Sequence, residues 1–171
     1  MSLNRFCGSG LEAINQASAY VKSGFTDLML AGGVESMSRV KMGADGGAMM
    51  MDPAVALKGH TIPQGVSADL IASKFGYSRR MVDEFAAESQ RRAAAAEAAG
   101  YFAKSRIDVT DENGFVLLNR DENVRAGTTA DSLASLKPSF EMMGQMAGFD
   151  DVAIQKYPEV AAINHVHHAG N

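Results

Sequence analysis

The stretch Asn4–Ala17, NRFCGSGLEAINQA, holds the only cysteine of the 171-residue chain, set between an aromatic residue and a glycine. From Gly8 onward, apolar residues recur at helical spacing, and Gly24 follows them as a stop signal. This pattern predicts a helix that starts at Gly8 and ends before Gly24. Cys7 would then lie at the first turn of that helix.

This position gives Cys7 a possible chemical role. Backbone N–H groups at a helix N-terminus carry partial positive charge and favour a thiolate. Gly8 and Gly10 let the backbone approach a bound group closely, and free N–H groups there could hold an oxyanion. The combination suits acyl transfer through a thioester. The alternative is a small apolar residue, because free cysteine is among the most buried residue types.

The segments after this helix predict an α/β protein. The run TDLMLAGGVES, which starts at Thr26, has the composition of a short buried strand that ends at a double glycine. A helix followed by a strand after a short turn favours layered α/β packing. From Val40 to Gly65 the chain is rich in glycine, methionine and proline without a clear period, so we expect irregular structure.

Two further helices are expected, one over residues 67–75 with Ser67 as its cap, and one over residues 78–99. Ser78 would cap the second helix and Gly100 would end it. Asp83 is expected among the charged residues on its solvent face. Its narrow apolar face comprises Val82, Phe85, Ala86, Ser89 and Ala93.

The last third of the chain predicts small elements. Two β-type runs flank a polar turn at residues 111–114, which indicates a hairpin. The sequence TTADSLASL predicts a short helix, and an extended segment follows that ends in HVHHAGN. In an extended segment His165 and His167 share one side. No carboxylate or thiol stands at ligand spacing beside them, so we expect no metal site there.

Composition excludes several function classes. Sixteen basic and twenty acidic residues give a net charge of −4, without the basic cluster that nucleic acid or an anionic membrane would require. The apolar runs are too short to span a bilayer, and the first residues do not resemble a secretion signal. A single free cysteine fits a reducing compartment. We therefore expect a cytoplasmic protein without a membrane span.

Several motifs together resemble one family. NRFCGSGLEAIN followed by DLMLAGGVESMS is similar to the nucleophile segment and the next strand of the thiolases, which are acyl-CoA acyltransferases. The likeness continues through PQGVSADLIASKFGYSRRMVDEFAAESQRRAAAA and VRAGTTADSLASLKPSF. It implies an α/β fold in which residues 1–39 belong to a layered α/β/α core. Residues 40–171 would form a mixed α+β loop domain that binds coenzyme A and returns towards the core.

The resemblance also implies roles for single residues. Cys7 occupies the position of the cysteine that accepts the acyl group while coenzyme A leaves. Arg125 and Ser132 match residues near the adenine nucleotide of coenzyme A, and Phe140 matches an aromatic residue beside the pantetheine or adenine. An arginine suits an anionic nucleotide. The ordinary alternatives are a surface charge, a polar helix position and a core aromatic residue.

The family's other catalytic motifs do not occur in these residues. A G-H-P histidine, a C-x-G-G-G cysteine and an N-E-A-F asparagine are all absent from the sequence. Two functions therefore remain open: a weakly active or inactive thiolase-type acyltransferase of fatty-acid metabolism such as β-oxidation, or a non-catalytic thiolase fragment that binds coenzyme A or a partner chain. A third, a decarboxylating condensing enzyme, fits AGGVESMS and the long insertion less well.

A partner chain is also expected. The apolar run after Thr26 would have its neighbouring strands in segments that this sequence does not contain, which leaves an apolar edge open. We expect a homo-oligomer or a companion thiolase segment to cover it.

Overall fold

The computed structural model describes residues 1–44 and 46–171, with Met50 described by its backbone alone. The chain divides into two compact units, Met1–Gly47 and Ala48–Asn171. The division into 1–39 and 40–171 expected from the sequence concerns the family architecture and stays a prediction. None of the described helices is long and apolar enough to cross a membrane.

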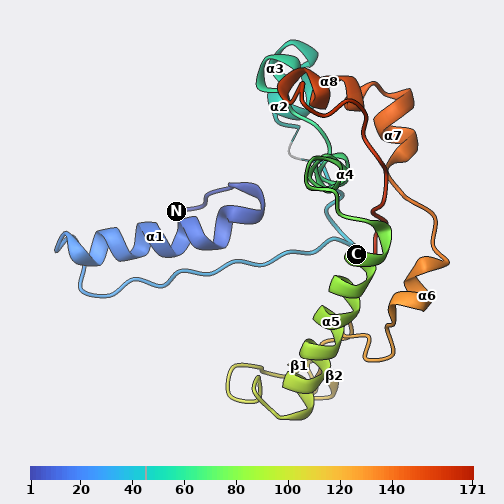
Figure 1. The fold of residues 1–171 in the computed structure, drawn as a ribbon. Helices are drawn as coiled ribbons and strands as arrows, with labels where there is room; N and C mark the ends of the chain where they lie inside the picture. Colours follow the sequence, from blue (N-terminus) through green and yellow to red (C-terminus); the bar gives the residue numbers. More distant parts are fainter. Residues whose placement is uncertain (45) are drawn as a thin grey trace. The chain divides into compact units, whose positions relative to one another are not determined.

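The first unit consists of one long helix and an extended return segment (Figure 1). A 3₁₀ turn, η1 (Phe6–Gly8), leads directly into α1 (Ser9–Lys22). Gly24 has a φ of 73°, a left-handed conformation that glycine adopts at low cost. The helix predicted from the apolar spacing is therefore confirmed, and so is its stop signal.

The strand predicted after Thr26 does not form. Residues 27–35 follow an extended path without strand pairing, and the side chains of Leu28, Leu30 and Val34 are 78%, 90% and 96% exposed. A β-strand is stable only when a neighbouring strand satisfies its backbone N–H and C=O groups. The only sheet among the described residues consists of β1 and β2, both in the other unit. The expectation of a buried strand was therefore wrong for this chain.

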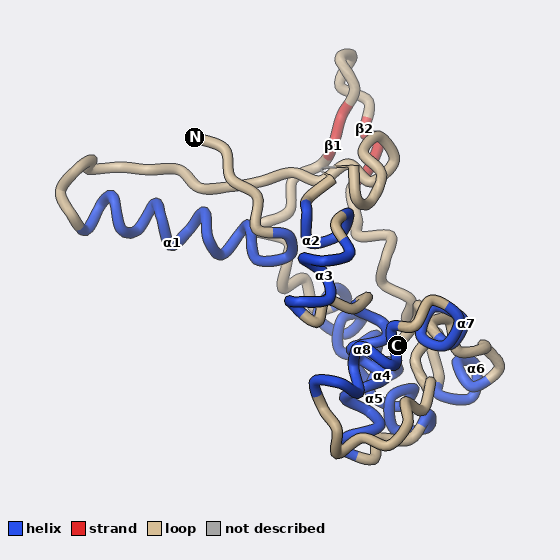
Figure 2. Tube along the Cα trace, turned by 90° about the horizontal axis from the view of Figure 1, so that it is seen from above, coloured by secondary structure: helices blue, strands red, loops and turns tan. Residues whose placement is uncertain are grey.

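The second unit consists of helices joined by loops, with one small sheet (Figure 2). Its elements in chain order are α2 (Ala48–Met51), α3 (Pro53–Gly59), α4 (Gln64–Phe75), α5 (Arg79–Ala98), β1 (Val109–Thr110), β2 (Val116–Leu118), α6 (Ala130–Ala134), α7 (Glu141–Met146) and α8 (Phe149–Lys156). Asp52 caps α3 by accepting hydrogen bonds from the N–H groups of Ala54 and Val55. The segment expected to be irregular between residues 40 and 65 thus contains two short helices.

The two central helices were predicted with different success. Helix α5 begins after Ser78, whose hydroxyl oxygen accepts a hydrogen bond from the N–H of Met81, and Gly100 beyond its end has a φ of 72°. Both features confirm the prediction. Helix α4 begins three residues before the predicted cap, and the Ser67 hydroxyl donates to the carbonyl of Pro63 at 3.2 Å. Ser67 is therefore a residue of the first helical turns and not the cap.

The faces of α5 also differ from the prediction. Phe85, expected in the apolar face, is 79% exposed, whereas Asp83, expected in solvent, is 1% exposed. A buried carboxylate is tolerated when hydrogen bonds and charge replace its water. Asp83 has one such partner nearby, Arg79 at i−4, and two far along the chain, His168 and Asn171, which no local pattern could reveal. Ala86 is buried, as expected.

The last third of the chain contains both confirmed and unexpected elements. Strands β1 and β2 pair antiparallel around the predicted turn, and Thr129 and Ser132 close a capping box at α6. Helices α7 and α8 were not predicted. Residues 157–171 contain turns at 158–159 and 169–170 on either side of the stretch 163–168, which has no helix or strand, and Val160 joins Leu70 and Ala153 in a small apolar core between α4 and α8.

Candidate active site

The only cysteine is exposed at the entrance to α1. Cys7 is the middle residue of η1, and the peptide continues without a break into the first turn of α1. The exposure excludes the interpretation of Cys7 as a buried apolar residue. Its thiol is accessible to a reagent or a substrate from solvent.

The backbone before Cys7 is held in an unusual conformation. Phe6 has a φ of 50°, one of only two non-glycine residues of the described chain in the left-handed region. Two local hydrogen bonds maintain this turn: the N–H of Phe6 donates to the Asn4 side-chain oxygen at 3.0 Å, and the N–H of Arg5 donates to the Ser9 hydroxyl oxygen at 2.8 Å. Such strain in a non-glycine residue is commonest at functional sites.

Two of the backbone donors near Cys7 are already engaged. The N–H of Gly8 donates to the carbonyl of Arg5 at 3.0 Å, and the N–H of Ser9 donates to the carbonyl of Phe6. The expectation of free N–H groups for an oxyanion therefore does not hold at these two amides. Glu12 in the first turn of α1 is paired with Arg5 at 2.8 Å, which places a salt bridge beside the cysteine segment.

The three residues matched to coenzyme A contacts lie in different elements of the second unit. Arg125 is exposed in the loop before α6, and its N–H donates to the side chain of Gln90 on α5 at 2.7 Å. The Ser132 hydroxyl donates to the Thr129 carbonyl at 2.8 Å. Phe140 is half-buried at the start of α7.

The ring of Phe140 packs directly on a glycine of α4. A Cβ atom added to Gly65 would collide with the ring carbons of Phe140. Gly65 is thus required by the close approach of α4 to this aromatic ring. Of the three matched residues, Phe140 has the clearest packing role, and Arg125 is the one that carries a charge, which is exposed.

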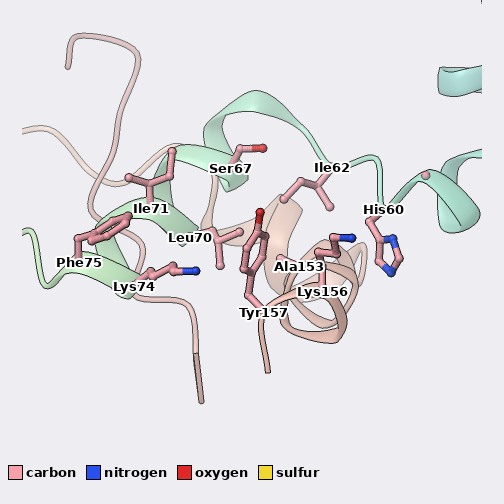
Figure 3. A pocket seen from close by; sticks show the side chains of 11 residues that line it. His60, Ile62, Ser67, Leu70, Ile71, Lys74, Phe75, Ala153, Lys156 and Tyr157 are labelled. Atoms are coloured by element: carbon pink, nitrogen blue, oxygen red, sulfur yellow. The ribbon is translucent and has the colours of Figure 1, made fainter. Parts of the chain in front are cut away.

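A hollow of about 460 Å³ lies between α4 and α8 (Figure 3). Lys74 beside it pairs with Glu159 at 2.6 Å, and its ammonium lies 4.4 Å from the centre of the Tyr157 ring. None of the three residues matched to coenzyme A lines this hollow. Its lining comprises Gly59, His60, Ile62, Ser67, Leu70, Ile71, Lys74, Phe75, Ala153, Lys156 and Tyr157.

A buried cluster of carboxylates and histidines is the feature that sequence analysis missed. The Asp69 side chain is fully buried, and its Oδ1 accepts hydrogen bonds from the backbone N–H groups of Val166 and His167 at 3.0 and 2.9 Å. The ring Nδ1 atoms of His165 and His167 both lie 2.8 Å from this carboxylate. The predicted shared side of these two histidines is confirmed, and the carboxylate they share lies on α4, far from them in sequence.

A second buried carboxylate anchors the end of the chain. Asp83 Oδ2 lies 2.7 Å from Arg79 Nε, and its Oδ1 lies 2.5 Å from Asn171 Nδ2 and 3.1 Å from His168 Nε2. Burial alone would raise the pKa of Asp83, but the hydrogen bonds from Arg79, Asn171 and His168 outweigh it and lower that pKa. Asp83 is therefore ionised at neutral pH.

Comparison with known proteins places these features in a family. Residues 1–152 match the model of the thiolase N-terminal domain. The chain belongs to the thiolase family, and the α/β fold expected from the resemblance is confirmed.

Relatives and a solved structure support this assignment. The chain is 37% identical to a beta-ketothiolase of Cupriavidus necator over 90% of its own length and 44% of the relative. It is 41% identical to a beta-ketoadipyl-CoA thiolase of Acinetobacter baylyi over 80% of its length and 39% of the relative. The dimeric peroxisomal thiolase of Saccharomyces cerevisiae matches 81% of this chain with a TM-score of 0.69 and 35% identity.

The coverage of these proteins is partial. The chain spans 44%, 39% and 36% of the length of the three proteins, respectively. The activity of these full-length relatives is therefore only proposed for this chain.

Proposed function

We propose that this chain supplies the nucleophile and part of the coenzyme A site of a thiolase-type acyltransferase. In the acylation step, Cys7 Sγ forms a bond to the thioester carbonyl carbon of an acyl-CoA. The bond from that carbon to the coenzyme A sulfur then breaks, and the leaving thiolate takes up the proton from Cys7. The acyl group passes afterwards to a second thiol or to a carbon acceptor. The observation that carries this proposal is the exposed Cys7 at the start of α1.

The structure supports an electrostatic role for the segment around Cys7. Helix α1 has 14 residues, so its N-terminal turn presents the positive end of a substantial dipole to the sulfur. The left-handed Phe6 fixes the direction in which the chain enters this turn. Both features keep Cys7 in a fixed position at the start of α1, as a nucleophile that must meet a bound substrate requires.

For coenzyme A, the most suitable of the matched residues is Arg125. Its guanidinium is exposed and always charged, so it can pair with a phosphate. Ser132 and Phe140 are proposed at the same ligand by resemblance. The capping box orients the Ser132 hydroxyl, and the packing on Gly65 fixes the Phe140 ring.

A second candidate function is binding without turnover. The sequence contains none of the family's G-H-P, C-x-G-G-G and N-E-A-F motifs, so the 171 residues supply neither the base nor the second cysteine. Without a base and preorganised oxyanion donors, a thiolate loses most of its transition-state stabilisation. We expect little or no thiolysis or condensation by the 171-residue chain alone.

Acyl transfer to Cys7 can be tested separately from turnover. The chain is incubated with acetyl-CoA or acetoacetyl-CoA, and intact mass spectrometry measures the acyl adduct, with Cys7→Ala as the negative control. One acyl group per chain, lost in Cys7→Ala, supports the nucleophile. If no adduct forms and acyl-CoA gives no protection of Cys7 against iodoacetamide, the proposal fails. Steady-state turnover that Cys7→Ala abolishes would instead exclude the non-catalytic alternative.

The proposed assembly is a homo-oligomer or a complex with a companion thiolase segment. The exposed apolar side chains of Leu28, Leu30 and Val34 support it, because such a row is normally covered. The solved Saccharomyces cerevisiae relative is described as dimeric. We place the protein in the cytoplasm, on the basis of its single free cysteine.

A further inference from the structure

The ring of His165 lies between carboxylates from two different helices. Its Nδ1 is 2.8 Å from Asp69 Oδ2 on α4, and its Nε2 is 3.0 Å from Asp150 Oδ2 on α8. The His165 side chain is 3% exposed. Each ring nitrogen therefore has a carboxylate oxygen, and not water, as its partner.

This arrangement determines the protonation state of the ring. An ionised carboxylate can only accept hydrogen bonds, and a neutral imidazole has only one N–H to donate. Two carboxylate partners are satisfied together only when both ring nitrogens carry a proton. Because a carboxylic acid is far more acidic than an imidazolium, the shared protons reside on the ring. His165 is thus an imidazolium between two negative charges.

The groups that face His165 from each neighbouring element agree with this state. Helix α4 contributes Asp69, α8 contributes Asp150, and the segment of His165 itself contributes His167, which shares Asp69. Helix α7 places Gly144 against this site, where an added Cβ would collide with Asp150 and His165. Burial alone would lower the pKa of His165, but the hydrogen bonds and charges of Asp150 and Asp69 outweigh it and raise that pKa.

His168, three residues further on, provides an internal comparison. Its Nδ1 accepts a hydrogen bond from the N–H of Gly170 at 2.9 Å, so that nitrogen carries no proton. Its Nε2 then donates to Asp83 at 3.1 Å. His168 lies in a site of similar burial, with side-chain exposures of 2% and 1% for the pair. The two histidines therefore differ in their partners: His165 has a carboxylate oxygen at each ring nitrogen, whereas His168 has one carboxylate and one backbone N–H.

The same segment is attached to α4 through its backbone. Asp69 accepts the N–H groups of Val166 and His167, and the Ser73 hydroxyl oxygen accepts the N–H of Asn164 at 2.7 Å. If His165 loses a proton, one carboxylate oxygen faces a ring lone pair, and the buried Asp69 and the partly buried Asp150 lose a positive charge between them. Deprotonation should therefore weaken the attachment of residues 163–168, the segment that carries His165, to α4 and α8.

We propose that protonated His165 is a clasp that holds residues 163–168 on α4 and α8, and that this segment loosens as the pH rises. A group whose pKa is raised on folding stabilises the folded arrangement fully below its unfolded value, 6.5 for histidine. That stabilisation is lost as the pH rises through the folded value. Residues 163–168 are therefore held firmly on α4 and α8 in mildly acidic solution, and this attachment weakens as the solution becomes alkaline. It does not depend on the acyl-transfer proposal.

The test combines two NMR measurements on the 171-residue chain between about pH 5 and about pH 9. Ring ¹⁵N shifts report the protonation of each histidine, and hydrogen exchange, corrected for its intrinsic pH dependence, reports the protection of the Val166 and His167 amides. We expect His165 to titrate with a midpoint above 6.5. The amide protection should fall over the pH interval in which His165 titrates. For each pH unit by which that midpoint exceeds the unfolded value, the protection should fall about tenfold in total.

Two variants separate the clasp from general stability. In Asp150→Asn one carboxylate becomes an amide, so the midpoint of His165 should fall and the pH dependence of amide protection should move with it. In His168→Gln the pH dependence should stay as in the unsubstituted chain. A His165 ring that titrates at or below 6.5, or amide protection that is flat across the interval, would overturn the proposal. Both results come from the unsubstituted chain, so they do not depend on whether a variant folds.

Discussion

The carboxylate of Asp69 and the ring of His165 meet at 2.8 Å although 96 positions separate them in the sequence. This contact joins α4 to the extended end of the chain, and the same carboxylate receives two backbone N–H groups there. The second unit is thus held together by buried charge as well as by its small apolar core. The following predictions test this description and its counterpart in the first unit.

Asp69→Asn should strongly destabilise the second unit. The substitution keeps the shape of the side chain but removes the charge that compensates His165, and its NH₂ group cannot accept a hydrogen bond. Breaking a buried charge pair costs about 3–5 kcal/mol. Urea unfolding followed by circular dichroism measures the effect. Asp131→Asn is the control, because its side chain is 92% exposed and should change the free energy of unfolding by about 0.5 kcal/mol or less. Equal effects of the two substitutions would refute the role of Asp69.

Gly144→Ala should disturb the same cluster through volume alone. The new methyl group would meet the Asp150 carboxylate and the His165 ring, both of which are constrained by their partners. Overpacking of this kind costs roughly 1–3 kcal/mol. Gly127→Ala is the matched control, since nothing lies within 4 Å of its added Cβ and its φ is not positive. The melting temperatures of the two variants, measured side by side, should differ clearly, and a neutral Gly144→Ala would contradict the packing described.

The stability of the chain should fall in acid as Asp83 becomes protonated. The pKa of Asp83 is lowered on folding from 3.8, so its contribution is present above that value and is lost as the pH falls through the folded value. Arg79→Met should move the acid unfolding midpoint upward, because the neighbouring positive charge is removed. Arg80→Met is the control, since Arg80 pairs with Glu84 on the surface. If both variants unfold at the same acidic pH, the ion pair of Arg79 and Asp83 does not determine the stability of the chain in acid.

Leu30→Lys should reduce self-association of the chain. Leu30 is 90% exposed in an extended segment whose backbone has no strand partner among the described residues, so a second copy can add to it. A lysine at this position opposes such pairing by charge repulsion. Sedimentation velocity should show a shift towards monomer, while Met42→Lys, at an equally exposed site outside the segment, should behave as the unsubstituted chain. A monomer already in the unsubstituted protein at micromolar concentration would refute the expected assembly.

Local signals predicted the elements that local forces stabilise. Helices α1 and α5 carry long apolar periods with a glycine after each end, and the hairpin has a polar turn of the right length. The strand after Thr26 was wrong because a strand depends on its neighbours, and composition does not show whether they are present. Helices α7 and α8 were missed because each is short and adjoins Gly148, whose left-handed φ of 74° interrupts the pattern.

The candidate site divides in the same way. Cys7 was identified because a rare residue type stood at a helix start, and its exposure in the structure agrees with that interpretation. The cluster around Asp69 and Asp83 left no such signal: each carboxylate appears as one more polar residue on an amphipathic helix. Apart from Arg79, four positions before Asp83, the partners of these two carboxylates lie 85 to 98 positions away, a separation at which periodicity carries no information.

The distance along the chain between Asp69 and its partners has a consequence for the order of folding. Helices α4 and α5 can form as soon as they are synthesised, but their two buried carboxylates must remain hydrated until residues 165–171 arrive. Closing a loop of this length is slow compared with helix formation. During synthesis, therefore, α4 and α5 would form first, and the interior around Asp69 and Asp83 would be completed only after residues 165–171 have been made.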